Sequence, residues 1–137
     1  MKATELQIGD LVKIKGHLDY DKVQEIARDE NMQWYISFAC SATLFRAYEF
    51  EPIPLTPEIL EKNGFGFVKS SDKDTVWNGW WIYEGLELGT CCLNRDDNWP
   101  CFINIDDSNI KCEYVHQLQH ALRLCKLGDL ADNFKIQ

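Results

Sequence analysis

Two histidines near the carboxyl end of the chain have a spacing that suits a metal site on a helix. His116 and His120 are four residues apart, so a helix would point both imidazoles the same way, and Glu113 could supply a third ligand. Such a site would favour metal-assisted hydrolysis. The segment between the histidines lacks the glutamate of a zinc-protease helix, and both are expected on the solvent face, opposite Leu118. Surface histidines that bind no cofactor are therefore the competing interpretation.

A cluster of tryptophans offers a second kind of chemistry. Trp77, Trp80, Trp81 and Trp99 lie within one stretch, and such aromatic groups can form platforms for sugars, bases or peptides. Side chains alternate along a strand, so Trp80 and Trp81 cannot both face one core. The cluster predicts a binding surface, and the alternative is an internal layer between two halves of the molecule.

The remaining reactive groups have simpler explanations. Cys91-Cys92 would point to opposite faces of a strand, and no Cys-x-x-Cys motif occurs, so the six cysteines are interpreted as buried, inert thiols. The acidic pairs Asp96-Asp97 and Asp106-Asp107 fall in turn-like sequence and are interpreted as solvated. No catalytic residue is predicted from these groups.

Composition narrows the classes of partner. The net charge of −8 and pI near 4.8 disfavour binding to nucleic-acid phosphates or anionic membranes, which requires clustered Lys and Arg. An acidic surface can instead serve solubility, attract a basic partner or imitate nucleic acid. The chain begins without the apolar run of a secretory signal and contains no apolar run of about 18 residues. We therefore expect a cytoplasmic protein with free thiols.

The first 55 residues have the pattern of a β-rich module. Short β-type runs occur at 10–15, 22–27, 33–38 and 47–53, and predict a meander or a small barrel. The GDLVKI beginning at 9–14 resembles the first strand of a Src-homology-3-like barrel. In the first run, Val12 and Ile14 are expected to face the core, and Leu11 is expected to have no partner.

The second module, residues 56–137, alternates helical and β-type patterns. Thr56, Pro57 and Gly64 predict a capped helix over 57–63, and β-type runs follow at 65–69, 75–83, 86–93 and 100–105. Within them, Asn78-Gly79 predicts a tight hairpin or a bulge. An apolar stripe predicts a helix over 113–126, closed by Gly128 and followed by a short helical turn.

The predicted fold class is thus α+β, with a β-rich half followed by helix, antiparallel strands and a C-terminal helix. The joint at 53–57 is too short to act as a flexible linker, so modules 1–55 and 56–137 are expected to pack as one cooperative unit.

Three sequence blocks carry a family resemblance. They are ELQIGDLV at 5–12, IPLTPEIL at 53–60 with GF at 64–65, and YVHQLQHAL at 114–122. In order and spacing they resemble a group of small uncharacterised proteins encoded by Bacteroidetes genomes, often in phage-like or mobile regions. The resemblance implies a bacterial or phage origin and brings with it no catalytic residue, cofactor or partner.

These observations lead to one main hypothesis and two alternatives. The main hypothesis is a non-enzymatic binding or adaptor protein whose partner is another protein, because the chain is small and acidic, has surplus aromatics and lacks an assembled catalytic set. The alternatives are a small metal-assisted hydrolase and an acidic mimic of nucleic acid that inhibits a host enzyme.

Overall fold

The N-terminal half is built on an open antiparallel sheet. A computed structural model describes residues 1–137 except 17–19, 39–40, 47–48, 72–76, 92–100 and 106–107. The strands follow one another as a meander, and the last returns beside the first, giving the order β4-β3-β2-β1-β5. Their bounds are Leu11–Ile14 (β1), Tyr20–Arg28 (β2), Trp34–Phe38 (β3), Ser41–Phe45 (β4) and Phe50–Pro52 (β5).

This sheet does not close on itself. Strands β4 and β5 are its two edges, and no pairing joins them among the described residues. The meander prediction is confirmed and the closed Src-homology-3-like barrel is wrong, because closure requires the edge strands to pair. Strand β4 was not predicted, and β5 is only three residues long.

A small core packs on one face of this sheet. Val12, Val23 and Ile36 are fully buried there, and the ring of Phe38 lies 6.2 Å from that of Phe50 across the sheet. The short 3-10 helix η1 (Ala3–Glu5) covers the core, to which Ala3 and Leu6 contribute. The N-terminal half therefore has its own apolar centre.

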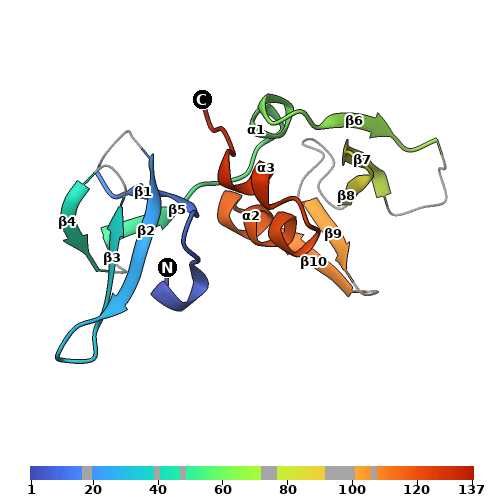
Figure 1. Ribbon diagram of the computed structural model, residues 1–137. Coiled ribbons are helices and arrows are strands. Elements are labelled where there is room, and N and C mark those ends of the chain that lie inside the picture. The colour runs from blue at the N-terminus through green and yellow to red at the C-terminus, as the bar shows by residue number, and fades with distance from the viewer. Residues whose placement is uncertain (17–19, 39–40, 47–48, 72–76, 92–100, 106–107) are drawn as a thin grey trace.

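The C-terminal half contains a second antiparallel meander, in the order β10-β9-β8-β7-β6 (Figure 1). Its strands are Gly66–Lys69 (β6), Trp77–Tyr83 (β7), Leu86–Cys91 (β8), Cys101–Ile105 (β9) and Ser108–Cys112 (β10). Helix α1 (Pro57–Lys62) precedes it and confirms the capping prediction, since the Thr56 hydroxyl accepts a hydrogen bond from the Ile59 N–H at 3.3 Å. Strand β10 was not predicted.

Asn78-Gly79 lies inside strand β7. The pairing with β8 shifts register between Trp77 and Gly79, so the bulge alternative is confirmed and the hairpin alternative is wrong. A Cβ atom on Gly79 would collide with the carbonyl oxygen of Val68 and the ring of Phe67. Glycine is therefore needed here for close strand packing. The chain reverses instead at Glu84-Gly85, where both φ angles are positive, 43° and 84°.

Helices α2 (Val115–Leu124) and α3 (Gly128–Asp132) lie between the two sheets (Figure 1). Helix α2 is shorter than the predicted 113–126. Its end is set by Lys126, which has a φ of 63°, and the Leu127 N–H donates to the Leu122 carbonyl at 2.8 Å. Gly128 does not close this helix as predicted but begins α3, which is the expected short helical turn.

The start of α2 is fixed by the joint between the halves. Leu55 N–H donates to the Glu113 carbonyl and Val115 N–H donates to the Ile53 carbonyl, both at 2.9 Å. Glu113 is thereby held in an extended segment before the helix. These bonds attach the joint to the last third of the chain.

Strand β1 is buried on both faces, which corrects the expectation for Leu11. Val12 belongs to the N-terminal core, and Leu11, only 4% exposed, packs in the larger core with Leu118 and Leu122 of α2. A strand covered on both sides loses the simple alternation of buried and exposed residues. The two halves thus share an apolar contact around α2.

Candidate functional site

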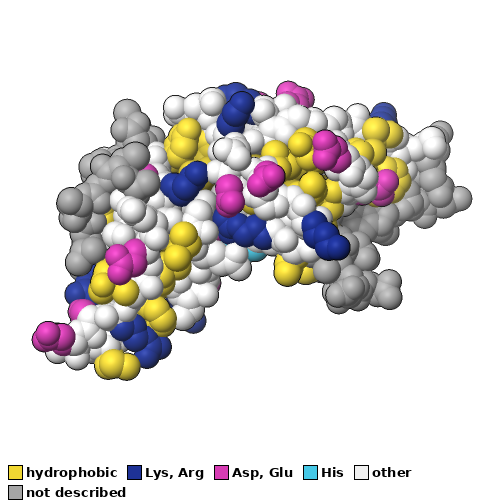
Figure 2. Space-filling view, viewed as in Figure 1, with side chains coloured by type: hydrophobic (Ala, Val, Ile, Leu, Met, Phe, Trp, Pro, Cys, Tyr) yellow, Lys and Arg dark blue, Asp and Glu magenta, His cyan; other side chains and the backbone are white. Residues whose placement is uncertain are grey.

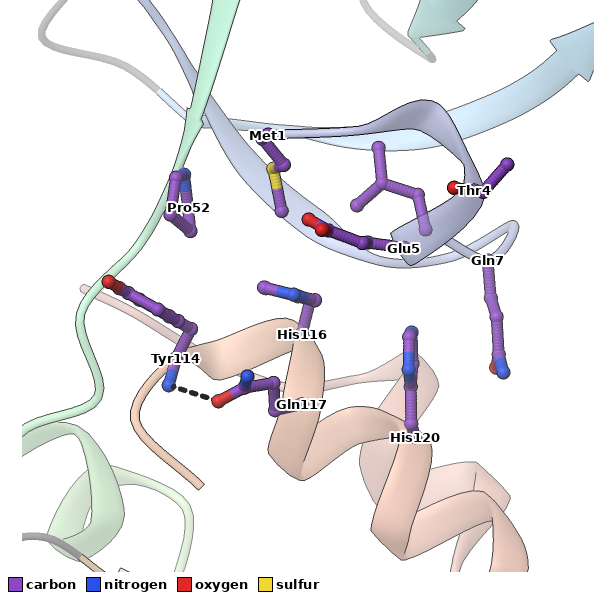
Figure 3. A pocket seen from close by; sticks show the side chains of 10 residues that line it. Met1, Thr4, Glu5, Gln7, Pro52, Tyr114, His116, Gln117 and His120 are labelled. Atoms are coloured by element: carbon purple, nitrogen blue, oxygen red, sulfur yellow. Dashed lines mark hydrogen bonds between the residues drawn. The ribbon is translucent and has the colours of Figure 1, made fainter. Parts of the chain in front are cut away.

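A pocket of about 780 Å³ opens between the two halves, where η1 faces α2 (Figure 3). Figure 2 shows an indentation in the outline of the molecule between the two halves. The described residues that line the pocket are Met1, Thr4, Glu5, Leu6, Gln7, Pro52, Tyr114, His116, Gln117 and His120. Both halves of the chain therefore contribute to its wall.

The first turn of α2 sets the polar floor of this pocket. The Gln117 side-chain oxygen accepts hydrogen bonds from the backbone N–H groups of Glu113, at 2.8 Å, and Tyr114, at 3.1 Å (Figure 3). This caps the helix start. The Tyr114 ring stacks on that of His116, with centroids 5.9 Å apart and planes 15° from parallel. The pocket thus presents an aromatic pair beside polar groups.

His116 is buried, contrary to the expectation of a surface histidine. It is 4% exposed, and its Nδ1 has no hydrogen-bond partner among the described residues. Burial lowers the pKa of His116 to about 4, although the negative charges of Asp10 and Glu5 act in the opposite direction. The imidazole is therefore neutral at pH 7.

Asp10 connects the segment after η1 to α2 from a fully buried position just before β1. One carboxylate oxygen bonds His120 Nε2 at 2.6 Å and accepts from the Gln7 N–H at 2.8 Å. The other accepts from the Arg123 guanidinium at 2.7 Å. A buried carboxylate needs this many partners to offset the loss of hydration. His120 is held against Asp10 and reaches the pocket as a half-buried side chain.

Gln119, also on α2, attaches this helix to three backbone groups. Its side-chain oxygen accepts from the Leu11 N–H at 2.9 Å, and its amide nitrogen donates to the carbonyls of Gly9 at 3.1 Å and Ala131 at 2.9 Å. Gln119 is fully buried. The polar face of α2 was predicted to meet solvent, but it meets the N-terminal half, because the helix lies between two sheets.

The structure does not bring the predicted metal ligands together. His116 and His120 are neighbours, with ring centroids 5.7 Å apart, but the Glu113 carboxylate pairs with the Lys111 ammonium. Across the described part of the chain, no three His, Cys, Asp or Glu side chains form a group that could hold a metal ion.

The tryptophans separate as strand alternation requires. Trp81 is 3% exposed and packs in the larger core, where its ring lies 5.1 Å from that of Phe67. Trp80 is half-buried on the opposite face, paired in register with Val68, which is 51% exposed. The side chain of Trp77, and Trp99 altogether, lie outside the described residues. Of the predicted platform's tryptophans whose side chains the structure describes, Trp80 therefore lies partly exposed and Trp81 lies in the core.

The thiols that the structure describes form no disulfide. Cys112 and Cys125 are both free, and burial raises the pKa of Cys112 to about 12, which keeps it protonated. Cys92, Asp96-Asp97 and Asp106-Asp107 lie outside the described residues, as does the side chain of Cys91.

Sequence reasoning did not identify Asp10, Glu5 or Tyr114 as site residues. Only the block resemblance pointed to their segments, since 5–12 and 114–122 are two of its three blocks. A comparison with protein-family models, curated proteins and solved structures finds no match. Within the described residues, no helix has the length and apolar character to cross a membrane.

Proposed function

We propose that this protein acts by binding a partner protein, and that the pocket between its halves receives a segment of that partner. The observation that carries the proposal is the pocket itself, a cavity of about 780 Å³ walled by η1, Pro52 and α2. A cavity of this size with a mixed polar and apolar lining is typical of ligand sites.

The chemistry of the lining supports binding more than catalysis. Asp10 is bonded to His120, Arg123 and the Gln7 backbone, and its bond to Nε2 fixes the orientation of the His120 imidazole. Catalysis of acyl transfer would need an activated nucleophile beside that imidazole. Of the described thiols, Cys112 is buried and protonated, and neither it nor Cys125 lines the pocket.

We also propose that the protein works in the cytoplasm and comes from a phage or mobile element. The free thiols of Cys112 and Cys125 are consistent with a reducing compartment. The origin rests on the sequence blocks alone.

The two alternative functions receive less support. Metal-assisted hydrolysis was based on three ligands, of which Glu113 pairs with Lys111 outside the pocket. If it were nevertheless correct, stoichiometric zinc would raise the melting temperature of chelator-free protein. Mimicry of nucleic acid requires aligned charge, but on the face in Figure 2 the acidic side chains are scattered among Lys and Arg.

A peptide-display selection tests the binding proposal. Random peptides are selected on the full chain, carrying its tag at the C-terminus because Met1 lines the pocket. Binding is then compared with Thr4→Trp, which places a large ring in the pocket wall from an exposed position, and with Gln24→Trp, a matched change at an exposed position of β2.

Peptides that bind the pocket should lose at least tenfold in affinity on Thr4→Trp and keep it on Gln24→Trp. Circular dichroism and melting temperature must show that both variants remain folded. If the selected peptides bind Thr4→Trp as well as the parent chain, the pocket is not the binding site.

A further inference from the structure

We infer that the pocket accepts a positively charged side chain, lysine or arginine, from a basic segment of the partner. This inference rests on the proposed function and specifies the chemistry of the occupant. It follows from the charges, the aromatic surface and the hydrogen-bonding groups that the pocket presents.

The charged side chain of the described pocket lining is negative, and Met1, with its terminal amino group, belongs to the same lining. Among the described residues of its lining, Glu5 supplies the one carboxylate, and neither lysine nor arginine is present. His116 adds no positive charge, because it is neutral at pH 7. A cationic side chain would thus be attracted to the Glu5 carboxylate, and an anionic one would be repelled by it.

The surroundings reinforce this preference. The carboxylates of Asp10 and Glu5 both favour positive charge at His116, where burial, with a smaller contribution from His120, keeps the ring neutral. The Arg123 guanidinium offsets part of the Asp10 charge, because its nitrogen lies 2.7 Å from the carboxylate oxygen that does not bond His120. The whole chain, at −8, would also attract a basic partner over longer range.

The shape of the site suits a planar or extended cation. The Glu5 carboxylate, drawn in Figure 3, lies on the η1 side of the pocket and faces α2, which carries Tyr114 and His116. A guanidinium or ammonium group between them would meet a carboxylate on one side and aromatic rings on the other.

The test compares two peptides of the same shape and different charge. Isotope-labelled protein is titrated by NMR with Ac-Gly-Arg-Gly-NH2 and with its neutral citrulline counterpart, Ac-Gly-Cit-Gly-NH2. Protein that begins at Met1 is compared with protein carrying a short N-terminal extension, which controls for the terminal amino group. Glu5→Gln removes the pocket carboxylate, and Glu61→Gln makes the same change at an exposed position of α1.

The arginine peptide should shift the signals of Tyr114 and His116 and bind about two to five times more tightly than the citrulline peptide, the range of an exposed ion pair. Glu5→Gln should abolish this preference, and Glu61→Gln should leave it unchanged. Equal binding of the two peptides, or a preference that survives Glu5→Gln, would overturn the inference.

Its failure can be told apart from failure of the proposed function. If displayed peptides depend on Thr4 but contain no basic residue, the pocket binds a partner of different chemistry and the present inference is wrong. If displayed peptides ignore Thr4→Trp, the proposed function itself fails.

Discussion

Replacing Gln119 with leucine should destabilise the whole molecule, because this amide joins the two halves. The side chain is fully buried and bonds the Leu11 N–H and the Gly9 and Ala131 carbonyls. Leucine has a similar size but bonds none of them. The Ala131 carbonyl keeps a bond from the Phe134 N–H, so two buried backbone groups lose the Gln119 partner that they have in the described structure.

Each unsatisfied buried group costs about 1–3 kcal/mol, and the more apolar side chain recovers part of this. We therefore expect the free energy of unfolding to fall by about 2–4 kcal/mol, a large share of the roughly 5–15 kcal/mol typical of a domain. Urea denaturation, followed by tryptophan fluorescence and far-UV circular dichroism, measures the change. Gln24→Leu, on the exposed side of β2, is the control and should change stability by less than about 0.5 kcal/mol.

The two probes should also give one shared transition in the parent chain and in Gln119→Leu, since the bonds tie α2 to both halves. A loss below about 1 kcal/mol would refute the reasoning about the buried amide. Separate transitions would refute the expected cooperative unit.

Three further predictions follow from burial. The free energy of unfolding should fall by about 3 kcal/mol between pH 6.5 and pH 4, because His116 gains a proton in that window in the unfolded chain but not in the folded one, where its pKa is about 4. Urea titrations should show a flatter pH profile for His116→Phe, and a profile equal to that of the parent chain would contradict this. Trp81→Ala should cost about 3–5 kcal/mol by denaturation and Trp80→Ala clearly less, so equal losses would contradict their placement on opposite faces. Iodoacetamide at pH 8 should modify the partly exposed Cys125 far faster than Cys112, whose pKa is about 12, and mass spectrometry locates the modified residue. Rapid modification of Cys112 in the folded chain would contradict its burial.

Local sequence signals predicted the elements that depend on near neighbours. Thr56, Pro57 and Gly64 define helix α1 because a cap, a fixed φ and a left-handed glycine act within one or two turns. Alternation likewise separated Trp80 from Trp81. The C-terminal helix was predicted in type, but its start depends on backbone bonds to Ile53 and Leu55, which lie far away in the chain, and no local pattern reveals them.

The site could not be predicted because it depends on what covers a polar helix face. His116, Gln119 and His120 look like a solvated side of α2, and that is the ordinary meaning of such a pattern. They are buried here because the N-terminal half lies on them and supplies Asp10, Gly9 and Leu11 as partners. The same packing explains why Leu11 is buried although it points away from Val12.

The most direct test of the pocket as the binding site is NMR of the two pocket histidines during titration with a peptide selected by display. Their imidazole signals, assigned with His116→Phe and His120→Gln, are followed to saturation. If the pocket is the site, both sets of signals shift together, with the dissociation constant that calorimetry gives for the same peptide. If the peptide saturates the protein while the signals of His116 and His120 stay unchanged, the binding site lies elsewhere.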